Sequence, residues 1–437
     1  LLFLYLISYA IYSYIIFGTC DDWVYGFKGT QIDNTDLKCV VPIPKICSFS
    51  IFDNLLDVPR ITGANCSDHT QYWYSKDSVI PHSNLQNQEV NSFAYPRTEQ
   101  WDMVQNTSYG IFQKHVLNNL INLDDPLVDS ALLESTEFRL SFWDSTDTEK
   151  FKAKLELKKN ETLEAEMQKR RAEFNGTELM FNNVLVIFID SLSRNHFRRK
   201  LPKTYKFLED KYNNTSDDEE VSSYQYLKFS SLYPGTLANM AAMYYGNYPH
   251  NPSTSVLTYF KEAGFVIGSS MNYCGRETID VEGEIQFTEQ KHDHELAGLF
   301  CDPNLHSLQG PFTFFSGPYS MTKKCLWGKD SVDWSIDYAK QFFSAYRNNS
   351  KFFRLSIIDS HEASSEMIKY DDDKLYDFLS WYESEGFMKD SLVMVMADHG
   401  FFMPGWIYQY FNFQDYEIEM TLPALFMTIP KDNPYYK

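Results

Sequence analysis

The sequence lacks an excess of positive charge, metal-binding pairs of cysteines and internal repeats. Lys and Arg number 39 against 59 Asp and Glu, a formal net charge of −20. The clustered cations that bind nucleic-acid phosphates are therefore missing, and no nucleic-acid partner is expected. None of the seven cysteines stands in a Cys-x-x-Cys pair, which leaves a zinc ribbon or a thioredoxin-like site without support. What the chain does have is 43% apolar residues, enough for a sizeable core.

The N-terminus lacks charge altogether. Residues 1–17 read LLFLYLISYAIYSYIIF, and as a helix they would extend about 25 Å. That length is short for a full hydrocarbon core but sufficient for a thin membrane. We therefore expect residues 1–18 to be a signal peptide or a transmembrane signal anchor. Because no Met precedes Leu1, the charges that set topology are expected upstream of this sequence.

Two features predict that the chain enters the secretory pathway. Asn-x-Ser/Thr sequons, the acceptors for N-glycans, are more numerous than chance suggests; they lie at Asn65, Asn106, Asn160, Asn175, Asn213, Asn214 and Asn348. The cysteines are expected to form disulfides in an oxidising compartment, early ones with one another and late ones likewise; they are Cys20, Cys39, Cys47, Cys66, Cys274, Cys301 and Cys325. We expect a cell-surface or extracellular protein, anchored in the membrane through its N-terminal segment.

The pattern divides the chain into an irregular region and an α/β region. From residue 19 to about 175, short apolar runs alternate with Pro, Asn, Asp and Cys, which predicts strands and loops held by disulfides. Within it, residues 148–174 are highly charged and contain neither Pro nor Gly, and we expect a strand, a turn and a helix there. Residues 176–437 form the expected catalytic domain.

Four continuous apolar runs in this domain predict strands that are covered on both faces, as in a parallel sheet. They are NVLVIFID (183–190), GFVIGSSMN (264–272), KFFRLSIID (351–359) and SLVMVMAD (391–398). Helix-like segments occupy 331–349 and 369–387, the second of which stops near Gly386. Strands that alternate with helices predict right-handed βαβ units and a doubly wound, mostly parallel sheet.

Three of these strands end in an acid: Asp190, Asp359 and Asp398. Two of the acids are closely followed by a histidine, at His361 and His399. The carboxyl ends of parallel strands meet at one edge, where open α/β sheets bind ligands. Asp and His offer the oxygen and nitrogen ligands that Zn²⁺ or Mn²⁺ accepts. The alternative, which the pattern leaves open, is that each Asp caps the helix that follows it.

A nucleophile for such a site is offered by YPGTLANMAAMYYGNYP (233–249). Thr236 follows Pro234-Gly235, a turn that would place it at the start of a helix ending at Gly246. A helix N-terminus favours bound anions, and coordination to a divalent metal activates a hydroxyl. Thr236 is therefore the candidate nucleophile; a role as N-cap of the helix is compatible with this.

Several motifs together resemble a known group of enzymes. NVLVIFIDSLSRNHF, YPGTLANMAAMYYGNYP and MADHG are similar, in order and spacing, to motifs of the alkaline phosphatase superfamily. That superfamily includes sulfatases, nucleotide pyrophosphatase/phosphodiesterases and phosphoethanolamine or lipoteichoic-acid transferases. IDSLSR, LPKTYKFLE, FKEAGFVIG, DHELAGLFCDPN, KCLWGK and MADHG look like positions of its sulfatase-like branch known as domain of unknown function 229. The resemblance covers roughly residues 39–430 and implies an alkaline-phosphatase-like fold.

The resemblance also implies roles for the candidate residues. Asp190, Asp398 and His399 would bind one divalent metal, Zn or Mn, together with Thr236. His361 resembles a histidine that assists the leaving group or binds a second metal. The remaining candidates are Asn239, which resembles an amide that contacts the oxygens of the transferred group, Asp359 as a further metal ligand, and Asp293 and His294, of which His294 is expected to be buried and hydrogen-bonded.

The sequence also departs from these relatives. No Cys/Ser-x-Pro-x-Arg motif stands at the nucleophile position, which argues against sulfatase chemistry that needs formylglycine. No His follows His399, and Asp359 and His361 stand closer together than the usual Asp-x-x-Gly-His pair, so one metal is expected rather than two. The sequence also stops at KDNPYYK, before such a fold would normally finish.

These observations predict a metal-dependent phosphoester hydrolase or a phosphoryl or phosphoethanolamine-type transferase with a threonine nucleophile. By analogy with these relatives, its substrate would be a phosphoester, a phospholipid or a glycan. The alternative is a catalytically inactive sulfatase-like glycoprotein with a structural or interaction role at the cell surface or membrane. A sulfatase is the third candidate.

Overall fold

The structure is a computed structural model that describes part of the chain. The described residues are 28–31, 40–43, 72–74, 79–81, 131–134, 138–145, 150–174, 181–213, 220–233, 235–246, 255–272, 292–296, 325–326, 329–361, 367–400 and 419–431.

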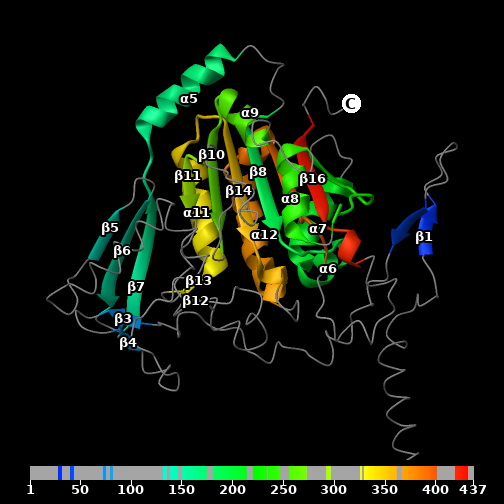
Figure 1. Ribbon diagram of the computed structural model, residues 1–437, viewed down its shortest axis with the longest axis horizontal. Helices are drawn as coiled ribbons and strands as arrows, with labels where there is room; N and C mark the ends of the chain where they lie inside the picture. The colour runs from blue at the N-terminus through cyan, green and yellow to red at the C-terminus, as the bar shows by residue number, and fades with distance from the viewer. Residues whose placement is uncertain are drawn as a thin grey trace, which may run out of the picture.

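A seven-stranded mixed sheet forms the centre of these residues (Figure 1), in the strand order β11-β10-β14-β8-β15-β16-β9. The strands are β8 (Asn183–Ile189), β9 (Val221–Gln225), β10 (Val266–Met271), β11 (His294–Leu296), β14 (Lys351–Ile357), β15 (Ser391–Met396) and β16 (Leu425–Pro430). Neighbours from β11 to β15 run parallel, whereas β16 is antiparallel to both β15 and β9. The four predicted strands are confirmed and adjacent in the sheet, and the antiparallel edge is an addition that the sequence did not predict.

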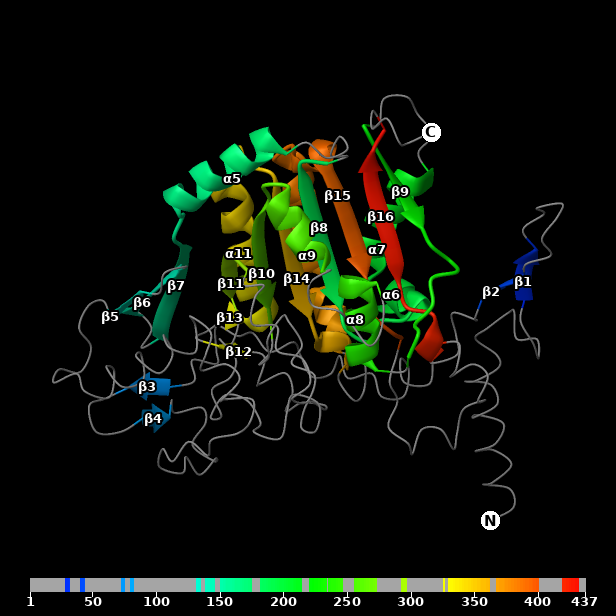
Figure 2. The same ribbon diagram turned by 45° about the horizontal axis from the view of Figure 1, so that its top comes forward.

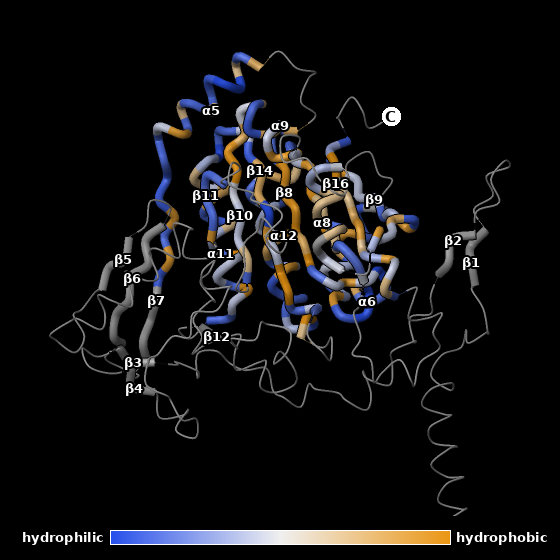
Figure 3. Tube along the Cα trace, in the orientation of Figure 1, coloured by the Kyte–Doolittle hydropathy of each residue, from blue (hydrophilic) through white to orange (hydrophobic). Residues whose placement is uncertain are grey.

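Helices cover both faces of the sheet, which confirms the α/β prediction and explains the continuous apolar strands (Figures 2 and 3). One face carries the larger core, built with α6 (Arg194–Lys200), α7 (Pro202–Asn213), α11 (Ser331–Ala345) and α12 (Asp372–Ser384). The other face carries a smaller core with α8 (Thr236–Tyr245) and α9 (Val256–Glu262). Along β8 the two cores alternate, with Ile187 in the first and Phe188 in the second.

The charged segment 148–174 folds into a strand, a turn and a helix, as predicted. The strand β7 (Lys150–Leu157) joins β5 (Ala131–Glu134) and β6 (Phe138–Ser145) in an antiparallel sheet, and α5 (Glu161–Glu173) follows. Asn160 caps α5, since its side chain accepts a hydrogen bond from the Leu163 amide at 3.0 Å. Leu155 of β7 and Met167 of α5 belong to the larger core, so both elements pack with the residues of the expected catalytic domain.

Most predictions for the N-terminal part concern residues outside the described ranges. They include segment 1–18 and every cysteine except Cys325, which begins β12 (Cys325–Leu326), the partner of β13 (Lys329–Asp330). The short antiparallel pairs β1 (Lys28–Gln31) with β2 (Val40–Ile43) and β3 (Tyr72–Tyr74) with β4 (Val79–Pro81) are described there. No helix in the described ranges is both long enough and apolar enough to cross a bilayer.

Some of the predicted sequons lie within the described residues and others lie outside them. Asn160 and Asn348 are exposed and therefore accessible to glycosylation. Asn213 is the last residue of α7. The other predicted sites, Asn65, Asn106, Asn175 and Asn214, lie outside the described residues.

Candidate metal centre and nucleophile

The predicted ligands gather at the carboxyl edge of the sheet. Asp190 follows β8 and Asp398 follows β15, and the register pairs Phe188 with Met396 across these two strands. Because both strands end at the same level, the two carboxyl groups lie close enough for the charge of Asp190 to raise the pKa of Asp398. The arrowheads of β8 and β15 point to the edge at which α8 lies (Figure 2). Parallel strands thus bring residues more than 200 positions apart into one site.

Asp190, His361 and His399 form a group that could hold a metal ion, because one ligand atom of each lies within 4.8 Å of the others. Around it, the His399 Nε2 atom lies 3.7 Å from Asp190 Oδ1 and 3.4 Å from Asp398 Oδ2. Asp190, Asp398 and His399 are all at most 3% exposed. The site therefore has a buried centre at Asp190 and His399, flanked by Asp398 and His361.

Thr236 is the first residue of α8, and its hydroxyl faces this centre. Its Oγ1 atom lies 3.3 Å from Asp190 Oδ1, to which it donates, and 3.2 Å from His399 Nε2. The N-cap of α8 is Gly235, which offers no side chain to the first amides. The hydroxyl thus serves the site rather than the helix cap, and the helix amides remain open to an anion.

The His399 ring is oriented by its own neighbour. Its Nδ1 atom lies 2.8 Å from the Gly400 carbonyl oxygen, so Nδ1–H donates there and the Nε2 lone pair faces the two carboxylates. Gly400 is required because a Cβ atom at this position would come 1.6 Å from the Glu419 carbonyl oxygen. The Asp-His-Gly sequence after β15 therefore supplies a carboxylate, an imidazole and a close backbone contact, one from each residue.

A buried ion pair supports the backbone that Gly400 touches. Arg199 Nη1 donates to Glu419 Oε1 at 3.0 Å, and both side chains are at most 4% exposed. Ser193, which caps α6, also donates to Glu419. Burial alone would raise the pKa of Glu419, but the Arg199 guanidinium holds that pKa below its ordinary value. Glu419 is therefore a charged anchor behind the Asp398-His399 turn.

The donor set fits a divalent cation. Asp398 Oδ2 is buried and accepts no hydrogen bond from the described residues. Burial and the neighbouring Asp190 carboxylate raise the pKa of Asp398 to about 6, and burial also raises the pKa of Asp190. Burial lowers the pKa of His361 to about 4, which keeps its imidazole neutral, as a ligand must be. Two buried carboxyl groups and two imidazoles are the ligands that Zn²⁺ or Mn²⁺ takes.

Ser191 is a site residue that sequence reasoning missed. It has a φ of 61°, unusual for a residue with a side chain. In this conformation its amide donates to Asp398 Oδ1 at 3.3 Å, and its hydroxyl donates to Asp190 Oδ1 at 3.2 Å. Ser191 thus orients both carboxylates, and its strain of about 1 kcal/mol or more marks a functional turn. The available signal was the polar Ser directly after the predicted strand-end Asp190.

Asn239 uses its side-chain amide within the loop before α8. Its Oδ1 atom accepts from the amides of Leu232 and Tyr233, and its Nδ2 atom donates to the carbonyls of Tyr233 and Gly235. Both hydrogens of the amide are thereby engaged. Asn239 shapes the loop that precedes Thr236, and the predicted contact with a transferred group would require these hydrogen bonds to open.

Asp359 is not a member of the three-residue group. Its carboxylate accepts from the Asn272 amide at 2.7 Å, and the group at the sheet edge contains His361 in its place. The turn after β14 therefore brings the histidine, and not the acid, close to Asp190 and His399.

Asp293 and His294 belong to the sheet and its core. His294 is 1% exposed, and its Nε2 lies 2.6 Å from the Tyr346 hydroxyl, so the predicted buried, hydrogen-bonded histidine is confirmed. Asp293 accepts from the Ile267 amide and from Lys261. Both residues therefore tie β11 to its surroundings.

The solved structures similar to this chain include three bacterial proteins. The C-terminal periplasmic domain of EcEptC from Escherichia coli, in complex with Zn, is 9% identical and covers 58% of this chain and 74% of its own, with a TM-score of 0.37. The lipoteichoic acid synthase LtaP from Listeria monocytogenes is 14% identical over 62% and 72%, with a TM-score of 0.36. A protein in the alkaline phosphatase superfamily from Vibrio parahaemolyticus is 15% identical over 63% and 70%, with a TM-score of 0.34.

No curated protein matches the sequence. A family match, by contrast, spans most of the chain, at residues 65–216 and 287–434, and includes Asp190, Asp398 and His399. The chain belongs to the family described as "Protein of unknown function (DUF229)".

Proposed function

We propose that this chain is a metal-dependent phosphoester hydrolase or phosphoryl-type transferase in which Thr236 is the nucleophile. The observation that carries the proposal is the Thr236 hydroxyl, which lies 3.2–3.5 Å from Asp190 and His399 at the open N-terminus of α8. A nucleophile, its activating group and an anion-binding helix end thus converge on one point.

A divalent metal held by Asp190, Asp398 and His399 would lower the pKa of the Thr236 hydroxyl and neutralise charge on the transferred group. The Thr236 hydroxyl loses its proton to solvent and its oxygen forms a bond to phosphorus, while the bond to the leaving oxygen breaks and that oxygen takes a proton from solvent. The amides of the first turn of α8 stabilise the phosphoryl oxygens. The oxygen of water or of an acceptor alcohol then attacks phosphorus and releases Thr236.

His361 suits either a ligand position or the second step. Its imidazole is neutral at physiological pH because burial lowers its pKa to about 4. A neutral imidazole can bind metal or take the proton of the incoming water, but it cannot donate a proton to the leaving group at neutral pH. We therefore assign His361 to metal binding or to the second half of the reaction.

The substrate we propose is a phosphoester of a phospholipid or glycan outside the cytosol. The exposed sequons Asn160 and Asn348 support a secretory route. Membrane attachment through residues 1–18 and the disulfides of the N-terminal region remain part of this proposal.

The test uses the purified protein loaded with Zn²⁺ or Mn²⁺ and the substrate bis(p-nitrophenyl) phosphate. We expect Thr236→Ala to abolish turnover and phosphoryl incorporation into the protein while metal content remains. Ser344→Ala is the control, because Ser344 is an exposed hydroxyl residue of α11, which covers the face of the sheet opposite to α8. Equal turnover of Thr236→Ala and wild type would disprove the nucleophile. Metal binding without turnover on phosphate or sulfate esters would favour the inactive glycoprotein.

A further inference from the structure

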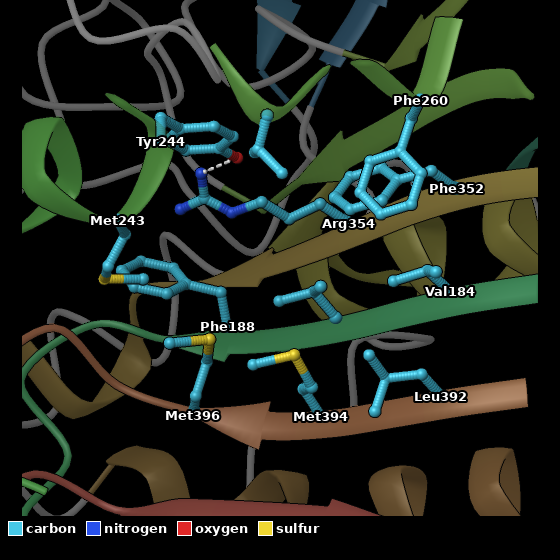
Figure 4. A pocket seen from close by; sticks show the side chains of 12 residues that line it. Val184, Phe188, Met243, Tyr244, Phe260, Phe352, Arg354, Leu392, Met394 and Met396 are labelled. Carbon is cyan, nitrogen blue, oxygen red and sulfur yellow. Dashed lines mark hydrogen bonds between the residues drawn. The ribbon is translucent and has the colours of Figure 1, made fainter. Parts of the chain in front are cut away.

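Arg354 is a buried cation on the face of the sheet that α8 covers. It lies in β14, is 4% exposed and has Phe188, Phe352 and Tyr244 among its neighbours (Figure 4). Burying a guanidinium among apolar side chains is costly unless specific contacts offset the loss of water. The position of its contacts therefore indicates what Arg354 does.

Those contacts lead to α8. One Arg354 Nη donates to the Tyr244 hydroxyl, and the other lies 3.6 Å from Met240 Sδ. The guanidinium also stands 4.1 Å from the centre of the Phe188 ring and 5.3 Å from that of Tyr244. Figure 4 shows the side chain extending from β14 towards Tyr244 with Phe188 beneath it. Such stacked, hydrogen-bonded contacts fix direction as well as distance.

The spacing links these contacts to the candidate site. Thr236, Met240 and Tyr244 are separated by four residues each, so they lie on one face of α8. Phe188 and Asp190 are two residues apart on β8 and its end, so they share one face of the sheet. Arg354 therefore contacts the face of α8 on which Thr236 lies, and it also contacts β8, the strand that Asp190 directly follows.

The N-terminal turn of α8 is tied to the preceding loop through Asn239, whereas further along the helix the side that faces the sheet packs through apolar side chains. Its N-cap has no side-chain hydrogen bond. Met240 and Met243 contribute to the smaller core, but methionine side chains are flexible and apolar packing is not directional. A cavity of about 300 Å³ lies beside Met243, Tyr244 and Arg354, so apolar packing does not fill this side of the helix.

We propose that Arg354 is a positioning residue: it sets the rotation and height of α8 on the sheet, and so places the Thr236 hydroxyl against Asp190 and His399. This inference rests on the proposed function, because it assumes that Thr236 must meet the metal and the phosphorus. Misplacing a reacting group by about 1 Å costs roughly 100-fold in rate. Arg354→Met keeps the apolar stem and removes the contacts, and Arg354→Lys keeps the charge but removes the planar fork.

A spectroscopic test does not depend on turnover. In Thr236→Cys protein loaded with Co²⁺, a thiolate-to-cobalt charge-transfer band reports that side chain 236 reaches the metal. We expect Arg354→Met in this background to remove most of the band, while visible ligand-field absorption and cobalt stoichiometry persist. A band that persists unchanged would overturn the role of Arg354 and leave the metal centre intact. If Thr236→Cys itself gives no band, Thr236 does not reach the metal and the inference fails with the proposed function.

Kinetics provide the second arm, with bis(p-nitrophenyl) phosphate as substrate. We expect Arg354→Met to lower kcat about 10- to 100-fold with KM within about threefold, and Arg354→Lys to restore little of it. Tyr244→Phe should lower kcat less, and adding it to Arg354→Met should have no further effect, since both act through one contact.

Lys351→Met is the matched control. Lys351 is a buried basic residue of the same strand, but its amine lies near Phe343 and Phe387 in the larger core, where burial lowers its pKa to about 7. If a buried basic side chain of β14 merely stabilises the fold, Lys351→Met and Arg354→Met should lower Tm and kcat in parallel. A selective loss of kcat in Arg354→Met supports positioning, and a parallel loss overturns it.

Discussion

Gly400→Ala should damage both the stability of the protein and its metal centre. A Cβ atom at Gly400 would stand 1.6 Å from the Glu419 carbonyl oxygen and 3.0 Å from Ser193 Cβ. The obstacle is backbone, so rotating a side chain does not relieve it. The Asp398-His399 turn must instead move away from the segment at Glu419, and the hydrogen bond from the Gly400 amide to the Met420 carbonyl, 2.7 Å long, must lengthen or break.

The size of the effect follows from three contributions. Forcing an extra methyl into a packed site costs about 1–3 kcal/mol, and losing the buried backbone hydrogen bond costs about 1 kcal/mol more. Replacing Gly by Ala also restricts the unfolded chain, which returns about 0.4–1 kcal/mol. The free energy of unfolding should therefore fall by about 1–3.5 kcal/mol, measured by urea unfolding with tryptophan fluorescence. Metal affinity should fall about 10-fold or more, because His399 moves with Gly400.

Gly246→Ala is the control for glycine replacement in general. Gly246 ends α8 with a φ of 74° and has open space around it, so Ala there meets only the left-handed backbone preference of about 1–2 kcal/mol. Its effect on metal affinity should be small. If Gly400→Ala were as stable as the wild type and bound metal equally well, the close contact with Glu419 would not constrain the turn, and the explanation of Asp-His-Gly would be refuted.

Three further predictions concern pH and the loop before α8. Burial lowers the pKa of His294 to about 4, so between about pH 6.5 and 4 the unfolded chain binds a proton at His294 that the folded chain does not. The free energy of unfolding should therefore fall by up to about 3 kcal/mol as pH falls through that window. His294→Gln should flatten the curve of unfolding free energy against pH. Because the pKa of Asp398 is raised to about 6, metal affinity measured by competition with a chelator should fall as pH drops below 6, and metal removal should lower Tm more at pH 8 than at pH 5. Asn239→Asp replaces an amide donor by a carboxylate beside the Tyr233 and Gly235 carbonyls, so it should destabilise the protein by about 1–3 kcal/mol and lower kcat, as unfolding and steady-state assays would reveal.

The sequence was sufficient for the central strands because their signal is local. A run such as 183–190 is apolar on both faces only when helices cover both faces, so β8 could be predicted without knowing its neighbours. The edge strand β9 offers no such signal. Val221–Gln225 contains two serines and a glutamine, and its strand conformation depends on pairing with β16. The antiparallel edge strand β9 could therefore not be predicted from its own sequence.

The residues of the candidate site also differ in whether a local sequence signal predicts their position. Asp190, Asp398 and His399 could be predicted because the end of a parallel strand fixes where a side chain lies. Beyond the strand end, the direction depends on the local turn. Asp359 begins a short 3₁₀ turn (η5, Asp359–His361) that directs its carboxylate to Asn272 and brings His361 to the metal group.

The two halves of the site also differ in how firmly they are held. Asp190 and Asp398 follow neighbouring strands joined by a backbone ladder, so their separation is set by the sheet. Thr236 comes from a helix that rests on the smaller core, beside a cavity, and Arg354 supplies the directional contact. Substitutions on that face should therefore reduce turnover before they reduce metal binding, whereas substitutions around Gly400 should reduce metal binding and turnover together. If the wild type is active, a variant that binds metal but has lost turnover would then point to a displaced α8, and not to loss of the metal ligands.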